Sequence, residues 1–137
     1  MKFIMNNPRA KNSEIDWQYA SESNDCSVRA TSIALGKPYK TVHEVFKKHG
    51  RKWGKGVTII TLLAVLKDVT KDNIKTVASD VIRKHTLATF IRENPKGKYV
   101  IVKSRHAFAV IDGVAYDAHP SCCTSRSIVK FAFKLGE

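Results

Sequence analysis

Three residues of this chain have the side chains that cysteine-based nucleophilic chemistry requires. Cys26 stands where a polar stretch gives way to an apolar one. His106 opens a segment of alternating residues, and Asp117 lies on the next segment. A thiol nucleophile needs a base to take its proton and a third group to orient that base. If the fold brings these side chains together, they can transfer an acyl group through a covalent intermediate.

The segment from Cys26 to Leu35 is expected to form a short, mostly buried helix, because apolar residues recur along it and Gly36 then stops it. Asn24 or Asp25 is the expected N-cap, which puts the cysteine in the first turn. There the helix dipole and the free N–H groups favour thiolate over thiol and can stabilise an oxyanion. Taken alone, such a cysteine is more often a small buried core residue.

The C-terminal half predicts adjacent strands joined by tight turns. Lys98 to Lys103 and His106 to Ile111 alternate as strands. Asp112-Gly113 has the composition of a two-residue type I′ turn, and Val114 to Asp117 follows it. This turn fixes which residues of the two strands face each other. It also accounts for Asp112, which needs no catalytic role.

In this register Phe108 faces Asp117, so the carboxylate shares a face with His106 and lies diagonal to it. Ala107 and Ala109 point to the other face, where two small residues suggest close packing against a helix. We therefore expect Asp117 to hold one nitrogen of the imidazole while the other faces the sulfur.

Two alternatives use residues that follow these strands. His119 lies opposite His106 in the same register, so a slip or bulge would exchange the two histidines. A metal site built from both histidines with Cys122 and Cys123 lacks a separated Cys-x-x-Cys pair, and we expect no metal or other cofactor. The three cysteines cannot all pair within the chain, which, with no secretory signal in the sequence, favours a reducing, cytoplasmic setting.

Two stretches of the chain carry a family resemblance. Asn-Asp-Cys-Ser-Val-Arg-Ala at 24–30, and Gly-Lys-Tyr-Val-Ile-Val at 97–102 leading into His-Ala-Phe-Ala-Val-Ile-Asp-Gly-Val-Ala-Tyr-Asp at 106–117, resemble the small papain-like cysteine peptidases of bacteriophage genomes. The resemblance implies a nucleophile helix packed on an antiparallel sheet, with Cys26 as nucleophile, His106 as base and Asp117 as third member. It makes residues 1–16 an N-terminal extension and 17–137 a single papain-like domain.

One position departs from the papain-like pattern. Such enzymes usually carry an oxyanion-hole glutamine shortly before the nucleophile, where this chain has Ala20. Gln18, if the loop from Ser21 to Asp25 is looped out, and Asn24 are the candidate replacements. A relative that keeps the fold without catalysis is the alternative.

The remaining segments predict helices first and then an antiparallel sheet, which is the α+β class. Thr41 to His49 and Thr58 to Lys67 have helical apolar patterns, and Thr86 is the expected cap of a third helix. Ile128 to Leu135 alternates as a strand with one solvent face. At 137 residues the chain is long enough for a single core. Because no apolar run approaches the length of a membrane span, we expect no membrane partner.

Charge is the second feature that needs an account. Lys and Arg total 24 against 12 Asp and Glu, which gives a net charge of +12. The charge is concentrated around an aromatic residue in the segment that contains Lys47, Lys48, Arg51, Lys52, Trp53 and Lys55. This segment could bind nucleic acid or an acidic protein, with Trp53 stacking on a base or filling a pocket. A solvated basic loop with Trp53 in the core is the simpler reading.

Three classes of function remain. The first is a thiol hydrolase or transferase that acts on an amide bond of a protein or peptide substrate, as a peptidase, isopeptidase or deamidase. The second is a nucleic-acid-binding module. The third is an inactive phage protein that captures an acidic host factor in the host cytoplasm. We favour the first, because it accounts for all three residues of the proposed triad.

Overall fold

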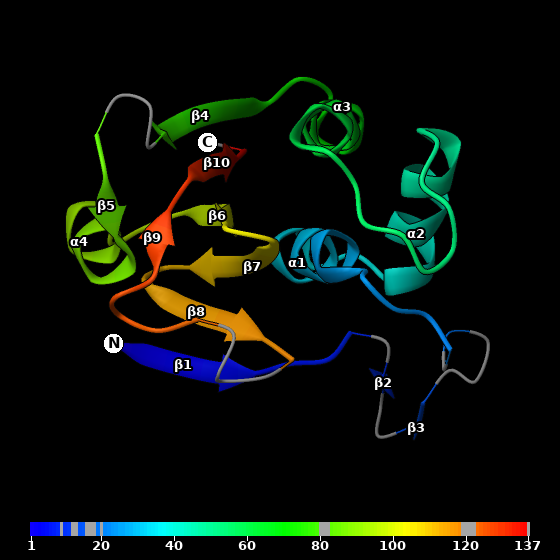
Figure 1. Ribbon diagram of the computed structural model, residues 1–137, viewed down its shortest axis with the longest axis horizontal. Helices are drawn as coiled ribbons and strands as arrows, with labels where there is room; N and C mark the ends of the chain where they lie inside the picture. The colour runs from blue at the N-terminus through cyan, green and yellow to red at the C-terminus, as the bar shows by residue number, and fades with distance from the viewer. Residues whose placement is uncertain are drawn as a thin grey trace.

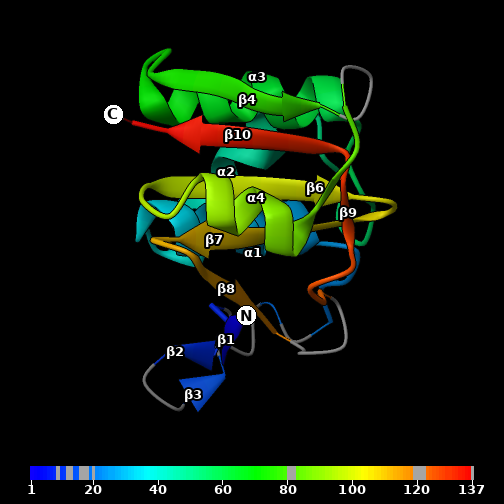
Figure 2. The same ribbon diagram turned by 90° about the vertical axis from the view of Figure 1, so that its left-hand side faces the viewer.

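The computed structural model describes residues 1–8, 10–11, 14–15, 19, 21–79, 83–118 and 123–136. These residues form an α+β fold in which one sheet lies between two groups of helices (Figure 1). The helices α1 (Cys26–Leu35), α2 (Tyr39–Lys48) and α3 (Ile59–Thr70) lie on one side. On the other side lies α4 (Leu87–Glu93), in front of the sheet in Figure 2. The α+β class is therefore confirmed.

The sheet has the strand order β1-β8-β7-β6-β10-β4. Its members in chain order are β1 (Lys2–Met5), β4 (Ile74–Ser79), β6 (Lys98–Lys103), β7 (His106–Ile111), β8 (Val114–Asp117) and β10 (Phe131–Leu135). Neighbouring strands are antiparallel except β1 and β8, which are parallel. Residues 2–5, expected within an N-terminal extension, thus form an edge strand of the main sheet. β4 precedes α4, so the chain does not complete its helices before it begins the sheet.

Two short ladders complete the strands. β2 (Ala10–Lys11) pairs with β3 (Glu14–Ile15). β5 (His85–Thr86) pairs with β9 (Ile128–Val129) beside α4. None of the helices in the described ranges has the length and apolar character needed to cross a bilayer.

The central strands have the predicted register. Val110 pairs with Ala115 and Ala109 with Tyr116, as a two-residue turn at Asp112-Gly113 requires. Both turn residues have positive φ, 47° and 79°, as a type I′ turn demands. The predicted hairpin is therefore confirmed.

The two faces of β7 contribute to different clusters of the core. Ala107 and Ala109 pack in the cluster that contains α1, where their small side chains allow the helix to approach closely. Phe108 and Val110 face the cluster that contains α4. The expected packing of a helix against the alanine face is thus confirmed, and it places the start of α1 beside the start of β7.

Candidate active site

Cys26 is the first residue of α1, as predicted, and is partly buried. Asp25 is the N-cap residue, as predicted, but in the described residues neither its side chain nor that of Asn24 caps the helix. Asp25 instead accepts a 2.7 Å hydrogen bond from the Tyr39 hydroxyl and lies 3.5 Å from Arg29. The N–H groups of Cys26 and Ser27 consequently keep no hydrogen-bond partner in the described part of the chain. They remain as donors at the positive end of the helix dipole.

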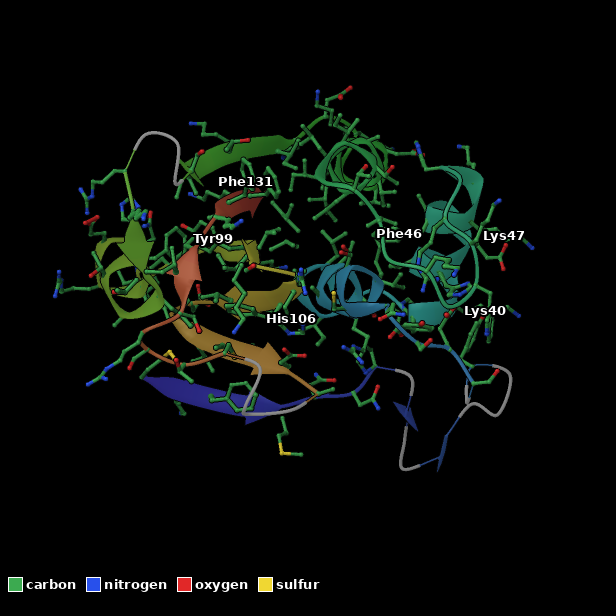
Figure 3. All side chains as sticks on the ribbon, in the orientation of Figure 1. Lys40, Phe46, Lys47, Tyr99, His106 and Phe131 are labelled. Atoms are coloured by element: carbon green, nitrogen blue, oxygen red, sulfur yellow. The ribbon has the colours of Figure 1, made fainter. Side chains whose placement is uncertain are left out.

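His106, the first residue of β7, lies beside α1 (Figure 3) and lines the same cleft as Cys26, close enough to the thiol for the two groups to shift each other's pKa. Burial by itself would raise the pKa of Cys26. The hydrogen bond and charge of His106, with smaller effects of the Ala107 N–H and of Arg29, outweigh burial and hold this pKa below its ordinary value. The site therefore favours the thiolate.

The imidazole is shifted in the complementary direction. Burial lowers the pKa of His106, but its hydrogen bonds to Asp117 and Cys26 outweigh burial and raise the pKa to about 9. A lowered thiol pKa beside a raised imidazole pKa shifts the pair toward the thiolate–imidazolium form. This is the form of a cysteine nucleophile that attacks a carbonyl carbon.

Asp117 orients the imidazole. Its Oδ2 accepts a hydrogen bond from His106 Nε2, so Nδ1 is the ring nitrogen left for the sulfur. Its Oδ1 accepts from the Ala118 N–H at 2.7 Å, and its carbonyl oxygen accepts from the Asn6 N–H at 2.8 Å. β1 and β8 thus hold both the carboxylate and its backbone, and the side chain is only 4% exposed.

Asp112 serves the turn, as expected. Its backbone N–H donates to the Gly97 carbonyl oxygen at 2.8 Å, and its Oδ1 accepts from the Gly97 N–H at 2.9 Å. These bonds close the end of the hairpin opposite to His106. The structure therefore brings Asp117, and not Asp112, to the imidazole.

A cleft of about 320 Å³ opens above Cys26 and His106. One wall is the turn between β6 and β7, which contributes Lys103 and Arg105. The opposite wall is the loop before α3, from Gly56 to Thr58. A substrate that enters this cleft meets the thiol, the imidazole and the free N–H groups at the start of α1.

Of the two candidate oxyanion donors, the structure describes only Asn24. Asn24 lines the cleft, but its amide donates a 2.9 Å hydrogen bond to the Gly54 carbonyl oxygen. That bond uses one of its two amide hydrogens and ties the start of α1 to the opposite wall. Gln18 lies outside the described residues, as do His119 and Cys122 of the alternative sites.

A buried carboxylate that sequence reasoning missed supports the same region. Glu22, with a fully buried side chain, accepts hydrogen bonds from Arg51 Nη1 at 3.0 Å and Nη2 at 3.1 Å, His43 Nε2 at 2.6 Å and the Gly54 N–H at 2.7 Å. Burial alone would raise the pKa of Glu22, but these hydrogen bonds outweigh it and lower the pKa to about 2. Glu22 therefore fixes the loop before α1 to the loop that forms the far wall of the cleft.

This network corrects the interpretation of the basic segment. Arg51, expected to bind an anionic partner, is 2% exposed and paired with Glu22. Trp53 is 47% exposed and stacks on Tyr19 with ring centroids 6.0 Å apart, so it lies on the surface rather than in the core. The lysines of the segment, Lys47, Lys48, Lys52 and Lys55, are exposed, and Lys48 lies 3.4 Å from Asp68.

The described residues bring no three His, Cys, Asp or Glu side chains together in a group that could hold a metal ion. They do bring together a thiol, an imidazole and a carboxylate in the order that nucleophilic acyl transfer requires. Comparison of the chain with protein-family models, with curated proteins and with solved structures found no match.

Proposed function

We propose that this protein is a papain-like thiol hydrolase or transferase that acts on an amide bond of a protein or peptide substrate. The observation that carries the proposal is that Cys26 and His106 line one open cleft while Asp117, behind the imidazole, accepts a hydrogen bond from it. A structural cysteine needs neither a histidine partner nor an opening to solvent. The arrangement of a nucleophile helix on a sheet that carries the histidine and the acid supports the papain-like assignment.

In this mechanism the Cys26 thiolate attacks the carbonyl carbon, and the carbonyl π electrons move to the oxygen. The N–H groups of Cys26 and Ser27 donate hydrogen bonds to that oxyanion. His106 gives its proton to the leaving amine as the C–N bond breaks, which leaves a thioester on Cys26. The neutral imidazole then takes a proton from water or an acceptor amine, and attack on the thioester releases the product. Asp117 keeps the ring oriented throughout.

An activated ester tests the proposal without knowledge of the natural substrate. On incubation with p-nitrophenyl acetate, the wild-type protein should release a burst of nitrophenolate and carry one acetyl group on the peptide that contains Cys26. Cys26→Ala should show neither, and His106→Asn should acylate far more slowly at neutral pH. Iodoacetamide should likewise label Cys26 before Cys122 or Cys123. Acylation that spreads evenly over the three cysteines would remove the nucleophile assignment.

A further inference from the structure

The charged side chains that line the cleft are all cationic. Lys103 and Arg105 join His106 at the wall formed by the β6–β7 turn, and no carboxylate of the described residues lines the cleft. Asp117 lies behind the imidazole and is engaged by it. We propose that Lys103 and Arg105 select acyl donors that carry a carboxylate side chain next to the scissile carbonyl. This inference rests on the proposed function and names its substrate class.

The backbone places both cations beside the base. Lys103 pairs directly with His106 across the ladder between β6 and β7, and Arg105 precedes His106 in the two-residue turn. In the part of the chain that the structure describes, neither cation forms an ion pair. Their charges are therefore available to a bound substrate, in contrast to that of Arg51, which is neutralised by Glu22.

The conformation of Arg105 points to a role for its side chain. Its φ is 60°, in the left-handed region that disfavours residues with a long side chain. Glycine or asparagine would suit this turn position better. The turn itself gives no reason for arginine, and backbone outliers of this kind concentrate at functional sites. The place of Arg105 in the lining of the cleft supplies such a reason.

The rest of the lining favours a peptide carboxylate over a polyanion. The remaining lining includes five apolar residues, Val57, Ile59, Leu62, Val102 and Ala107. A nucleic-acid backbone needs a continuous series of cations along its path. Two cations above an apolar surface instead match one or two acidic side chains on an otherwise uncharged peptide.

The test compares two small reagents that differ in charge. Iodoacetate is anionic and iodoacetamide is neutral, and both alkylate the thiolate of Cys26. Because both rate constants are proportional to the fraction of Cys26 that is thiolate, this fraction cancels in their ratio. The ratio then reports how the charges of the cleft affect the reaction with an anionic reagent. For a charge about 7 Å away in water, replacing one cation should lower the ratio about threefold, and replacing both about sevenfold, at low salt.

The variants are Lys103→Gln, Arg105→Asn and the double variant, with Lys40→Gln as control. Lys40 lies on α2 away from His106 and should leave the ratio unchanged (Figure 3). Arg105→Asn should melt at the same temperature as the wild type or higher, because asparagine relieves the backbone strain. A lower ratio in a variant that is at least as stable cannot then be attributed to unfolding.

Peptide amides extend the test to turnover. A peptide with Glu next to the scissile bond should have a higher kcat/KM than its Gln counterpart, and the double variant should remove this preference. If the ratio of the iodoacetate to the iodoacetamide rate constant is unchanged in the double variant, the inference is overturned, whatever the absolute rate at which Cys26 is alkylated. Conversely, if the ratio falls as expected but no peptide or ester is turned over, the charge selection stands and the proposed hydrolase function fails. A ratio changed equally by Lys40→Gln would mean that overall charge, and not the cleft, is responsible.

Discussion

The buried Glu22–Arg51 pair should be a large contributor to stability that can be removed by one conservative substitution. In Glu22→Gln, the new amide keeps one oxygen for the N–H groups of Ser23 and Gly54. Its nitrogen, however, would stand where Oε2 now accepts from Arg51 and His43. His43 can change tautomer to accept a hydrogen bond, whereas a guanidinium has no acceptor. Arg51 would therefore remain buried without a counter-ion.

The magnitude follows from the pKa of Glu22. At about 1.4 kcal/mol per pKa unit, a change from 4.5 in the unfolded chain to about 2 in the folded protein corresponds to about 3 kcal/mol of stability. This agrees with the roughly 3 to 5 kcal/mol lost when one partner of a buried ion pair is removed. For a domain of this size, such a loss corresponds to a fall in Tm of about 10 °C.

The direction of the Glu22 pKa shift determines the pH range in which its contribution to stability is lost. Because folding lowers the pKa of Glu22, its contribution is complete above about pH 5 and is lost as pH falls from 4.5 toward 2. Urea unfolding monitored by circular dichroism should therefore show the full difference between wild type and Glu22→Gln at pH 7. The difference should shrink as the pH is lowered below 4.5, because wild-type Glu22 is then increasingly protonated.

Glu44→Gln is the matched control. Glu44 is exposed on α2, so its substitution should change the free energy of unfolding by less than about 0.5 kcal/mol. Equal unfolding free energies for the two variants at pH 7 would show that the Glu22–Arg51 pair does not stabilise the fold. A difference that stayed constant from pH 7 down to pH 3 would show that the charge of Glu22 is not the cause.

Three further predictions concern the proposed triad and its candidate oxyanion donor. His106 has a pKa of about 9 and lowers the pKa of Cys26, so His106→Asn should move the pH profile of Cys26 alkylation to higher pH and slow alkylation by iodoacetamide at pH 6.5 at least tenfold. A pH profile that does not move would exclude the ion pair. Asp117→Asn should slow alkylation several-fold, whereas Asp112→Asn, which suits the turn, should react as wild type; the reverse result would reassign the acid. Asn24→Gly, which tolerates the φ of 52°, should lower ester turnover, by about a hundredfold if Asn24 donates to the oxyanion, while alkylation, which forms no oxyanion, stays within a factor of two.

Local sequence rules place each member of the proposed triad on its own helix or strand. A two-residue Asp-Gly turn sets the register of its two strands, and this places Asp117 on the same face as His106. Helix-start signals place Cys26 independently. No local rule predicts that the start of α1 lies beside the start of β7. The only sequence signal for this contact is Ala107 and Ala109, the small residues on which α1 packs.

No local sequence rule predicts the buried network around Glu22 and Arg51. Glu22 and Arg51 are 29 positions apart, in two loops without periodicity, and a charged residue in a polar stretch normally indicates exposure. The sequence therefore predicts that Arg51 lies on a binding surface, whereas in the structure its side chain is buried. The parallel pairing of β1 with β8 is similarly non-local, because it joins residues 2–5 to residues 114–117.

One irregular residue, Lys130, divides the last predicted strand in two. Residues 128–135 alternate, which predicted a single strand with one solvent face. Instead, residues 128–129 form β9, which pairs with β5, and the chain joins the main sheet only at Lys130, whose N–H donates to the Val102 carbonyl oxygen, so that β10 pairs with β6. Val129 and Ala132, assigned to opposite faces, consequently pack in the same cluster with α4. Of the face predicted to be solvated, Ala132 is buried in this cluster, whereas Ile128 and Lys130 are exposed.

The proposed site is thus assembled from three segments, the loop before α1, the loop before α3 and the turn between β6 and β7. Hydrogen bonds join the first two, through Glu22 to Gly54 and through Asn24 to the same residue. Strand pairing and the Cys26–His106 contact join the third. Because Gly54 takes part in both bonds, its loop is tied to the start of α1. The width of the cleft is therefore set by Glu22 and Asn24, whereas its charge is set separately by Lys103 and Arg105.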